Sequence, residues 1–113
     1  MTSQEHTFRG ISEWYETLFS KFGWLLLVQG LIKERKASRI ADFSTESKAK
    51  LNKLMTYVID IKRCLAAVEA RNRHEKDSGR KQDLKIMKHH LTILHGRATE
   101  MCREITGTTP SWE

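Results

Sequence analysis

Histidines and cysteines are the residues of this chain best suited to acid–base, nucleophilic or metal chemistry. His89 and His90 are adjacent, so they lie about 100° apart around a helix, and His95 follows five residues after His90. None of these pairs has the i, i+4 spacing that brings two imidazoles onto one metal ion. Cys64 and His95 are the one nucleophile–base pair that the predicted helices could bring together, and the sequence offers it no oxyanion donor. We therefore expect no catalytic, cofactor or metal site and no enzymatic activity.

Cysteine usage and motif content agree with that expectation. Cys64 and Cys102 are the only cysteines, and no secretory signal precedes the first polar stretch, which suggests a reducing compartment. In the helix pairing described below they would lie about 10 Å apart along the helix axis, too far for a disulfide. We expect buried free thiols. The sequence contains no CxxC or HExxH motif, phosphate loop or dinucleotide fingerprint.

Two segments in the second half of the chain carry apolar residues at alternating spacings of three and four. The first row is Leu51, Leu54, Val58, Ile61, Leu65 and Val68, and the second is Leu84, Met87, Leu91, Leu94, Ala98, Met101 and Ile105. This heptad spacing is typical of helices that pack along their whole length. It predicts two long helices that lie against each other.

The two apolar rows pair with each other at one constant register when the helices run antiparallel. Leu65 then lies opposite Leu94, with matching pairs on either side. We expect an antiparallel helical hairpin over residues 44–106, a rod of about 40 Å, whose turn is centred at Gly79 and Arg80. Hairpins of this kind usually present a surface to partners.

The N-terminal part of the chain predicts an aromatic-rich helix over residues 11–33, with Ser12 as its N-cap. Its apolar residues surround the cylinder, and a helix of this type is normally buried on all sides. The apolar run at residues 22–28 is far shorter than the roughly 18 residues that span a bilayer. We expect the helix to pack across the hairpin and its remaining apolar surface to contact a partner protein, or alternatively a membrane interface. The predicted partner-binding residues are Trp14, Tyr15, Phe19, Trp24 and Leu27.

The 113 residues fit one all-α domain, with few signals of disorder. We divide residues 1–113 into an N-terminal arm (1–10), the aromatic helix (11–33), a basic linker (34–43), the hairpin (44–106) and a tail (107–113). Ser44 is the expected N-cap of the second helix, and Gly107 the expected end of the third. Trp112 in the tail is a candidate anchor for a partner.

Basic residues concentrate at the predicted hairpin turn. Residues 71–88 include seven basic and three acidic residues, so this stretch carries +4 of the chain's net charge of +6. The predicted binding residues here are Arg73, Lys76, Arg80, Lys81 and Lys85. Such a cluster can bind phosphates, anionic lipid or an acidic protein surface. No aromatic residue is interleaved, which argues against base stacking and favours contacts that do not depend on sequence.

Two motifs resemble a known group of proteins. Residues 14–24, WYETLFSKFGW, and residues 80–87, RKQDLKIM, are similar to the patterns WYxxLFxKxGW and RKxDLxIM of small helical proteins encoded by large eukaryotic DNA viruses. The resemblance covers most of residues 11–95. The tyrosine-rich linker usual in that group is replaced here by residues 40–43.

The resemblance implies a non-enzymatic virion protein. Its implied role is that of a minor capsid protein that cements capsomers from inside or links the shell to the internal membrane. The implied partners are the major capsid protein and other minor capsid proteins, and the implied location is the virion capsid, with the host cytoplasm during assembly. A homo-oligomer and an anionic membrane surface are further candidate partners. The alternatives are a sequence-independent nucleic-acid-binding virion protein that uses the basic turn, and a host-directed interaction module.

Overall fold

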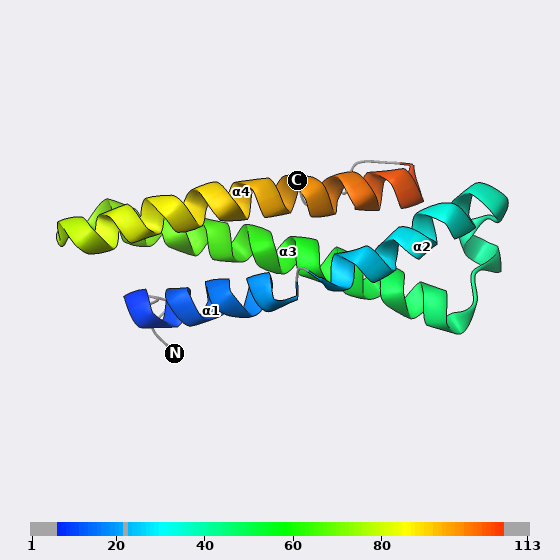
Figure 1. Ribbon diagram of the computed structural model, residues 1–113, viewed down its shortest axis with the longest axis horizontal. Helices are drawn as coiled ribbons and strands as arrows, with labels where there is room; N and C mark the ends of the chain where they lie inside the picture. The colour runs from blue at the N-terminus through cyan, green and yellow to red at the C-terminus, as the bar shows by residue number, and fades with distance from the viewer. Residues whose placement is uncertain (1–6, 22, 108–113) are drawn as a thin grey trace.

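The protein is all-helical in the computed structural model, which describes residues 7–21 and 23–107, apart from the side chains of Leu26 and Leu27. Its elements are α1 (Phe8–Ser20), α2 (Trp24–Ala37), the short 3₁₀ turn η1 (Ile40–Asp42), α3 (Thr45–His74) and α4 (Ser78–Thr106) (Figure 1). No strand occurs in these ranges. The predicted all-α class is therefore confirmed.

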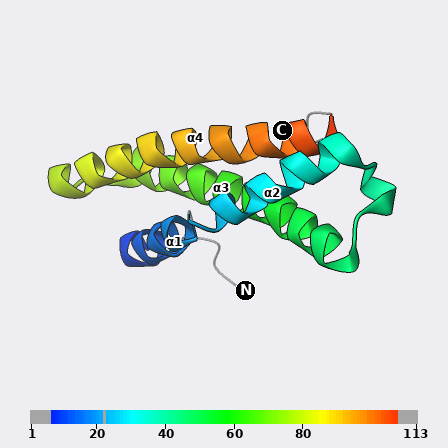
Figure 2. The same cartoon turned by 45° about the vertical axis from the view of Figure 1, so that its right-hand side comes forward.

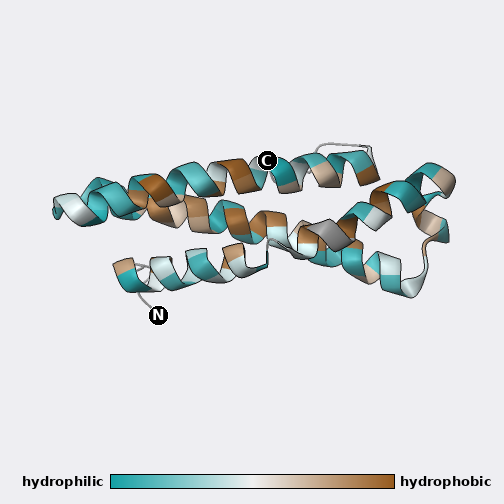
Figure 3. Ribbon diagram, viewed as in Figure 1, coloured by the Kyte–Doolittle hydropathy of each residue, from teal (hydrophilic) through white to brown (hydrophobic). Residues whose placement is uncertain are grey.

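The two longest helices, α3 and α4, form the body of the molecule. They lie side by side in both views, and the chain turns back between them through residues 75–77 (Figures 1 and 2). Their mutual contacts are the most extensive in the structure. Apolar residues lie along the sides where the two helices meet (Figure 3). Nearly all residues of the two predicted apolar rows are buried, and only Leu65 and Met101 are partly exposed.

Short polar contacts fix the ends of this helix pair. Ser44 caps α3, as predicted, because its hydroxyl accepts a hydrogen bond from the backbone N–H of Ser47 at 3.1 Å. Gly107 ends α4, also as predicted, with a φ of 80° that suits glycine. The predicted turn at Gly79 and Arg80 is wrong, because both residues lie in α4. Asp77 begins that helix earlier by accepting a hydrogen bond from the N–H of Arg80 at 2.9 Å.

The predicted aromatic helix over residues 11–33 is two helices, and this part of the prediction was wrong. α1 begins one turn earlier than expected, since Thr7 rather than Ser12 accepts the capping hydrogen bond from Gly10 N–H at 2.9 Å. α1 ends at Ser20 and is capped by Lys21, whose backbone N–H donates a hydrogen bond to the carbonyl of Leu18, and α2 starts after Gly23. The interruption lets each half bury its own apolar face.

α1 packs mainly on α3, whereas α2 contacts both α3 and α4 (Figure 2). In α1 the side chains of Ile11 and Leu18 are fully buried. In α2 the side chains of Leu25, Val28 and Leu31 are buried. The apolar run in the sequence predicts that some of residues 25–28 contact another chain. Leu25 and Val28 are instead covered within this one, because α2 faces two helices at once.

The predicted basic linker over residues 34–43 is shorter than expected. α2 continues to Ala37, and η1 then leads to Phe43, which is 4% exposed and anchors the connection in the core. The resulting molecule is elongated, with extents of 52 × 29 × 22 Å. Among the residues that the structure describes, no helix is both long and apolar enough to cross a membrane.

Candidate binding sites

Three of the predicted partner-binding aromatic residues are engaged within the chain. Trp14 donates a hydrogen bond from Nε1 to Oδ1 of Asp60 on α3 at 3.2 Å. The hydroxyl of Tyr15 lies 2.6 Å from Nδ1 of His90 on α4, and the ring of Phe19 meets the same histidine edge-on at 5.8 Å. All three side chains remain partly exposed. Their first role is thus to attach α1 to the α3–α4 pair. Leu27, also predicted to bind a partner, lies in α2 with a side chain outside the described set.

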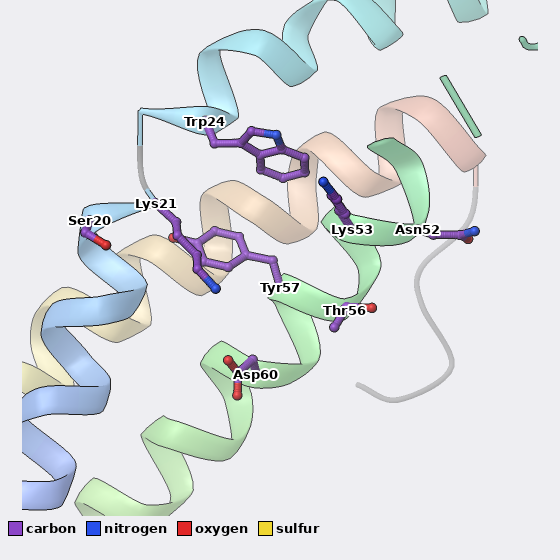
Figure 4. A pocket seen from close by; sticks show the side chains of 8 residues that line it. All are labelled: Ser20, Lys21, Trp24, Asn52, Lys53, Thr56, Tyr57 and Asp60. Atoms are coloured by element: carbon purple, nitrogen blue, oxygen red, sulfur yellow. The ribbon is translucent and has the colours of Figure 1, made fainter. Parts of the chain in front are cut away.

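Trp24 lines an open cleft between the junction of α1 and α2 and one face of α3 (Figure 4). The cleft has a volume of about 650 Å³, and we call it the aromatic cleft. Its lining comprises Ser20, Lys21, Trp24, Asn52, Lys53, Thr56, Tyr57 and Asp60. This volume falls within the range of sites that bind small molecules or peptide side chains, roughly 300–1,000 Å³.

The apolar wall of the aromatic cleft is built from two rings. The indole of Trp24 meets the ring of Tyr57 edge-to-face, with centroids 6.4 Å apart. Tyr57 is 6% exposed and donates a hydrogen bond from its hydroxyl to the carbonyl of Leu18 at 2.6 Å. Burial, with a smaller effect from the nearby Asp60 carboxylate, raises the pKa of Tyr57 to about 12. Tyr57 is therefore a fixed, neutral part of the wall, and it ties α3 to the end of α1.

The charged rim of the aromatic cleft comes from both sides of the α1–α2 junction. In Figure 4 the side chains of Lys21 and Lys53 reach toward the two rings from opposite sides. The ion pairs seen within residues 7–21 and 23–107 involve neither lysine. Asp60 is the acidic member of the lining and is already bonded to Trp14. The cleft thus combines an apolar wall with two ammonium groups.

The second candidate site is the turn between α3 and α4, where all five predicted basic residues are exposed. We call Arg73, Lys76, Arg80, Lys81 and Lys85 the basic end. It occupies a terminus of the α3–α4 pair that is coloured mainly hydrophilic in Figure 3. The guanidinium carbon of Arg80 lies 5.6 Å from the centre of the Phe8 ring, so this arginine also holds the start of α1.

Acidic residues at the basic end are used to build the turn. Glu75, 7% exposed, accepts hydrogen bonds from Nε and Nη2 of Arg71 at 3.2 and 3.1 Å and from the N–H of Asp77 at 3.2 Å. Asp77 caps α4. Two of the three local carboxylates, Glu75 and Asp77, are thus bonded within the turn, and the five cations of the basic end outnumber them.

The two cysteines and the side chains that could bind a metal ion are not arranged for nucleophilic or metal chemistry in the described residues. Burial, with a smaller effect from Asp60, raises the pKa of the Cys64 thiol to about 12, so it stays protonated at neutral pH and is a poor nucleophile. Cys64 and Cys102 are both buried, as predicted, and neither takes part in a disulfide. In the described part of the chain, no group of three or more His, Cys, Asp or Glu side chains is arranged to hold a metal ion.

Comparisons with protein-family models, curated protein sequences and solved structures find no match to this chain. The assignment of a function therefore rests on the two candidate sites and on the motifs in the sequence.

Sequence reasoning named all five residues of the basic end but only one residue of the aromatic cleft, Trp24. Lys21, Lys53, Tyr57 and Asp60 were not predicted, because the cleft depends on where α1 stops. Gly23 was the available signal, since glycine in a helix interior is unfavourable by about 1 kcal/mol relative to alanine. It stands at the interruption between the two helices.

The Glu75 carboxylate should make the stability of the turn depend on pH. The hydrogen bond from Asp77 N–H and the pairing with Arg71 outweigh burial and lower the pKa of Glu75 below its ordinary value of 4.5. Its contribution is therefore complete above about pH 5 and is lost as the pH falls below 4.5 toward the lowered pKa. The variant Glu75→Gln should be less stable than the wild type at neutral pH, and the difference should shrink on acidification. Urea unfolding followed by circular dichroism at several pH values measures this, and a pH-independent difference would contradict it.

Proposed function

We propose that this chain is a non-enzymatic structural protein whose basic end docks on an anionic surface. The observation that carries the proposal is the exposure of five basic side chains at one end of an elongated helix pair, where Glu75 and Asp77 are bonded within the turn. Exposed charge at a projecting end attracts an oppositely charged surface with little need for shape complementarity. The motif resemblance adds the setting: a minor capsid protein that cements capsomers or links a shell to an internal membrane.

The role of a spacer or cement requires a stiff body. We propose that α3 and α4 form an antiparallel hairpin with a heptad seam. The burial of nearly every residue of the two apolar rows supports this arrangement. Leu65 and Met101 are partly exposed and lie at the margin of the seam. Helices packed along their whole length in this way give an extended body.

The competing function is sequence-independent binding of nucleic acid through the same residues. The ring that the structure places beside the basic end, Phe8, is partly buried and lies 5.6 Å from the guanidinium carbon of Arg80. One partly buried ring gives no platform for successive stacked bases, so contacts to nucleic acid would fall mainly on phosphates. Arginine and lysine can also contact guanine edges in a major groove, and a preference among duplex sequences would reveal such contacts.

Binding of the purified chain to three probes at two salt concentrations tests the proposal. The probes are vesicles with and without phosphatidylserine, DNA duplexes of several sequences, and a purified major capsid protein of a large DNA virus. We expect association with phosphatidylserine vesicles or with capsid protein, no preference among duplexes, and a marked loss of duplex binding at the higher salt. Tight, sequence-selective duplex binding that survives the higher salt would overturn the proposal.

A further inference from the structure

The aromatic cleft has a chemistry that docking through the basic end does not use. Its wall is the half-buried indole of Trp24 beside Tyr57, whose hydroxyl is already bonded to Leu18. Trp24 is therefore the ring with surface left for a ligand. An indole in a concave site, next to an immobile second ring, is the usual kind of anchor point in a protein–protein contact.

The charged side chains around this wall favour a negatively charged ligand. Lys21 and Lys53 reach toward the rings from opposite sides without an ion-pair partner among the described residues (Figure 4). Asp60, the acidic residue of the lining, accepts a hydrogen bond from the Trp14 indole N–H through one carboxylate oxygen. A ligand with carboxylates on both sides of an apolar group would meet both ammonium groups and leave Asp60 in its present contact.

We propose that the aromatic cleft binds a short acidic peptide segment of a partner protein, with an aromatic side chain against Trp24 and flanking carboxylates at Lys21 and Lys53. The volume of about 650 Å³ accommodates side chains of this size. Asn52 and Thr56 at the margin are exposed and can hydrogen-bond to a peptide backbone. Nucleic acid fits less well, because single strands need several exposed rings in succession. The inference does not rest on the function of the basic end.

Fluorescence anisotropy with labelled peptides tests this site on the full chain. The probe is SEEFEES, and the matched peptides SQQFQQS and SEEAEES remove the charge or the ring. The variant Lys21→Glu/Lys53→Glu should weaken binding of SEEFEES by about tenfold or more. The control Lys33→Glu/Lys36→Glu makes the same change of charge at two exposed lysines of α2 outside the cleft and should leave the affinity within about twofold. Thermal unfolding by circular dichroism verifies that both variants are folded.

Amide chemical shifts place the binding site. We expect SEEFEES to perturb residues 20–24 and 52–60 and the indole N–H of Trp24, and both matched peptides to bind at least several-fold more weakly. Perturbations confined to residues 71–88, or equal losses in the two lysine variants, would assign the binding to charge at the basic end and overturn the inference. A several-fold gain of affinity in Trp112→Ala would also overturn it, because the chain's own tryptophan would then be the occupant.

Discussion

Replacing Leu94 with alanine is expected to lower the free energy of unfolding by about 2–5 kcal/mol. Leu94 is 1% exposed and lies in the core formed with α3. Its truncation removes apolar contacts and leaves a cavity that packed helices fill only in part. For a small domain this is a large fraction of a total stability of about 5–15 kcal/mol. Equilibrium unfolding in urea measures the change.

The neighbouring residue supplies a matched control for that experiment. Ile93 is 46% exposed, so Ile93→Ala removes a similar volume from the surface of the same helical turn. We expect this variant to lose less than about 1 kcal/mol. Equal losses at the two positions would mean that the face of α4 turned toward α3 has been assigned wrongly.

Neutralising three lysines of the basic end should reduce its affinity for phosphatidylserine vesicles by about a hundredfold at low salt, since each basic residue near an anionic surface contributes about fivefold. The variant is Lys76→Gln/Lys81→Gln/Lys85→Gln. Stability should change little, because exposed charges contribute little to folding. Flotation with vesicles over a range of protein concentrations measures the affinity.

A control with the same change of charge separates the position of the lysines from their number. Lys33→Gln/Lys36→Gln/Lys48→Gln removes three lysines outside both candidate sites. We expect it to lose only a few-fold in affinity, through the lower net charge. If both triple variants lose affinity equally, net charge rather than the basic end governs docking.

Periodicity predicted the long helices because apolar spacing and burial are directly linked in α3 and α4. Ser44 and Gly107 were found as helix ends because each acts through its own local chemistry, a side-chain acceptor or a left-handed backbone. The turn was misplaced because the register of apolar rows gives only their midpoint. The actual boundary depends on Glu75 and Asp77, whose side chains bond to backbone N–H groups of the turn.

The aromatic cleft could not be predicted from local patterns. Its residues come from two segments, 20–24 and 52–60, that are brought together only when α1 ends at Ser20 and packs on α3. A continuous apolar run at residues 22–28 reads as one helix, although Gly23 interrupts it. Which residues end a helix of this kind is decided by the surfaces available on its neighbours, and these are properties of the assembled fold.

The interruption between α1 and α2 also divides the chain into parts that need not open together. α1 is attached by two fully buried side chains, Ile11 and Leu18, whereas α3 and α4 share most of the core. Local opening therefore costs less at α1 than at the helix pair. The aromatic cleft spans this joint, because Ser20 and Lys21 belong to the end of α1 and the facing residues belong to α3. Occupation of the cleft and the closed state of α1 are thus thermodynamically linked, and each favours the other.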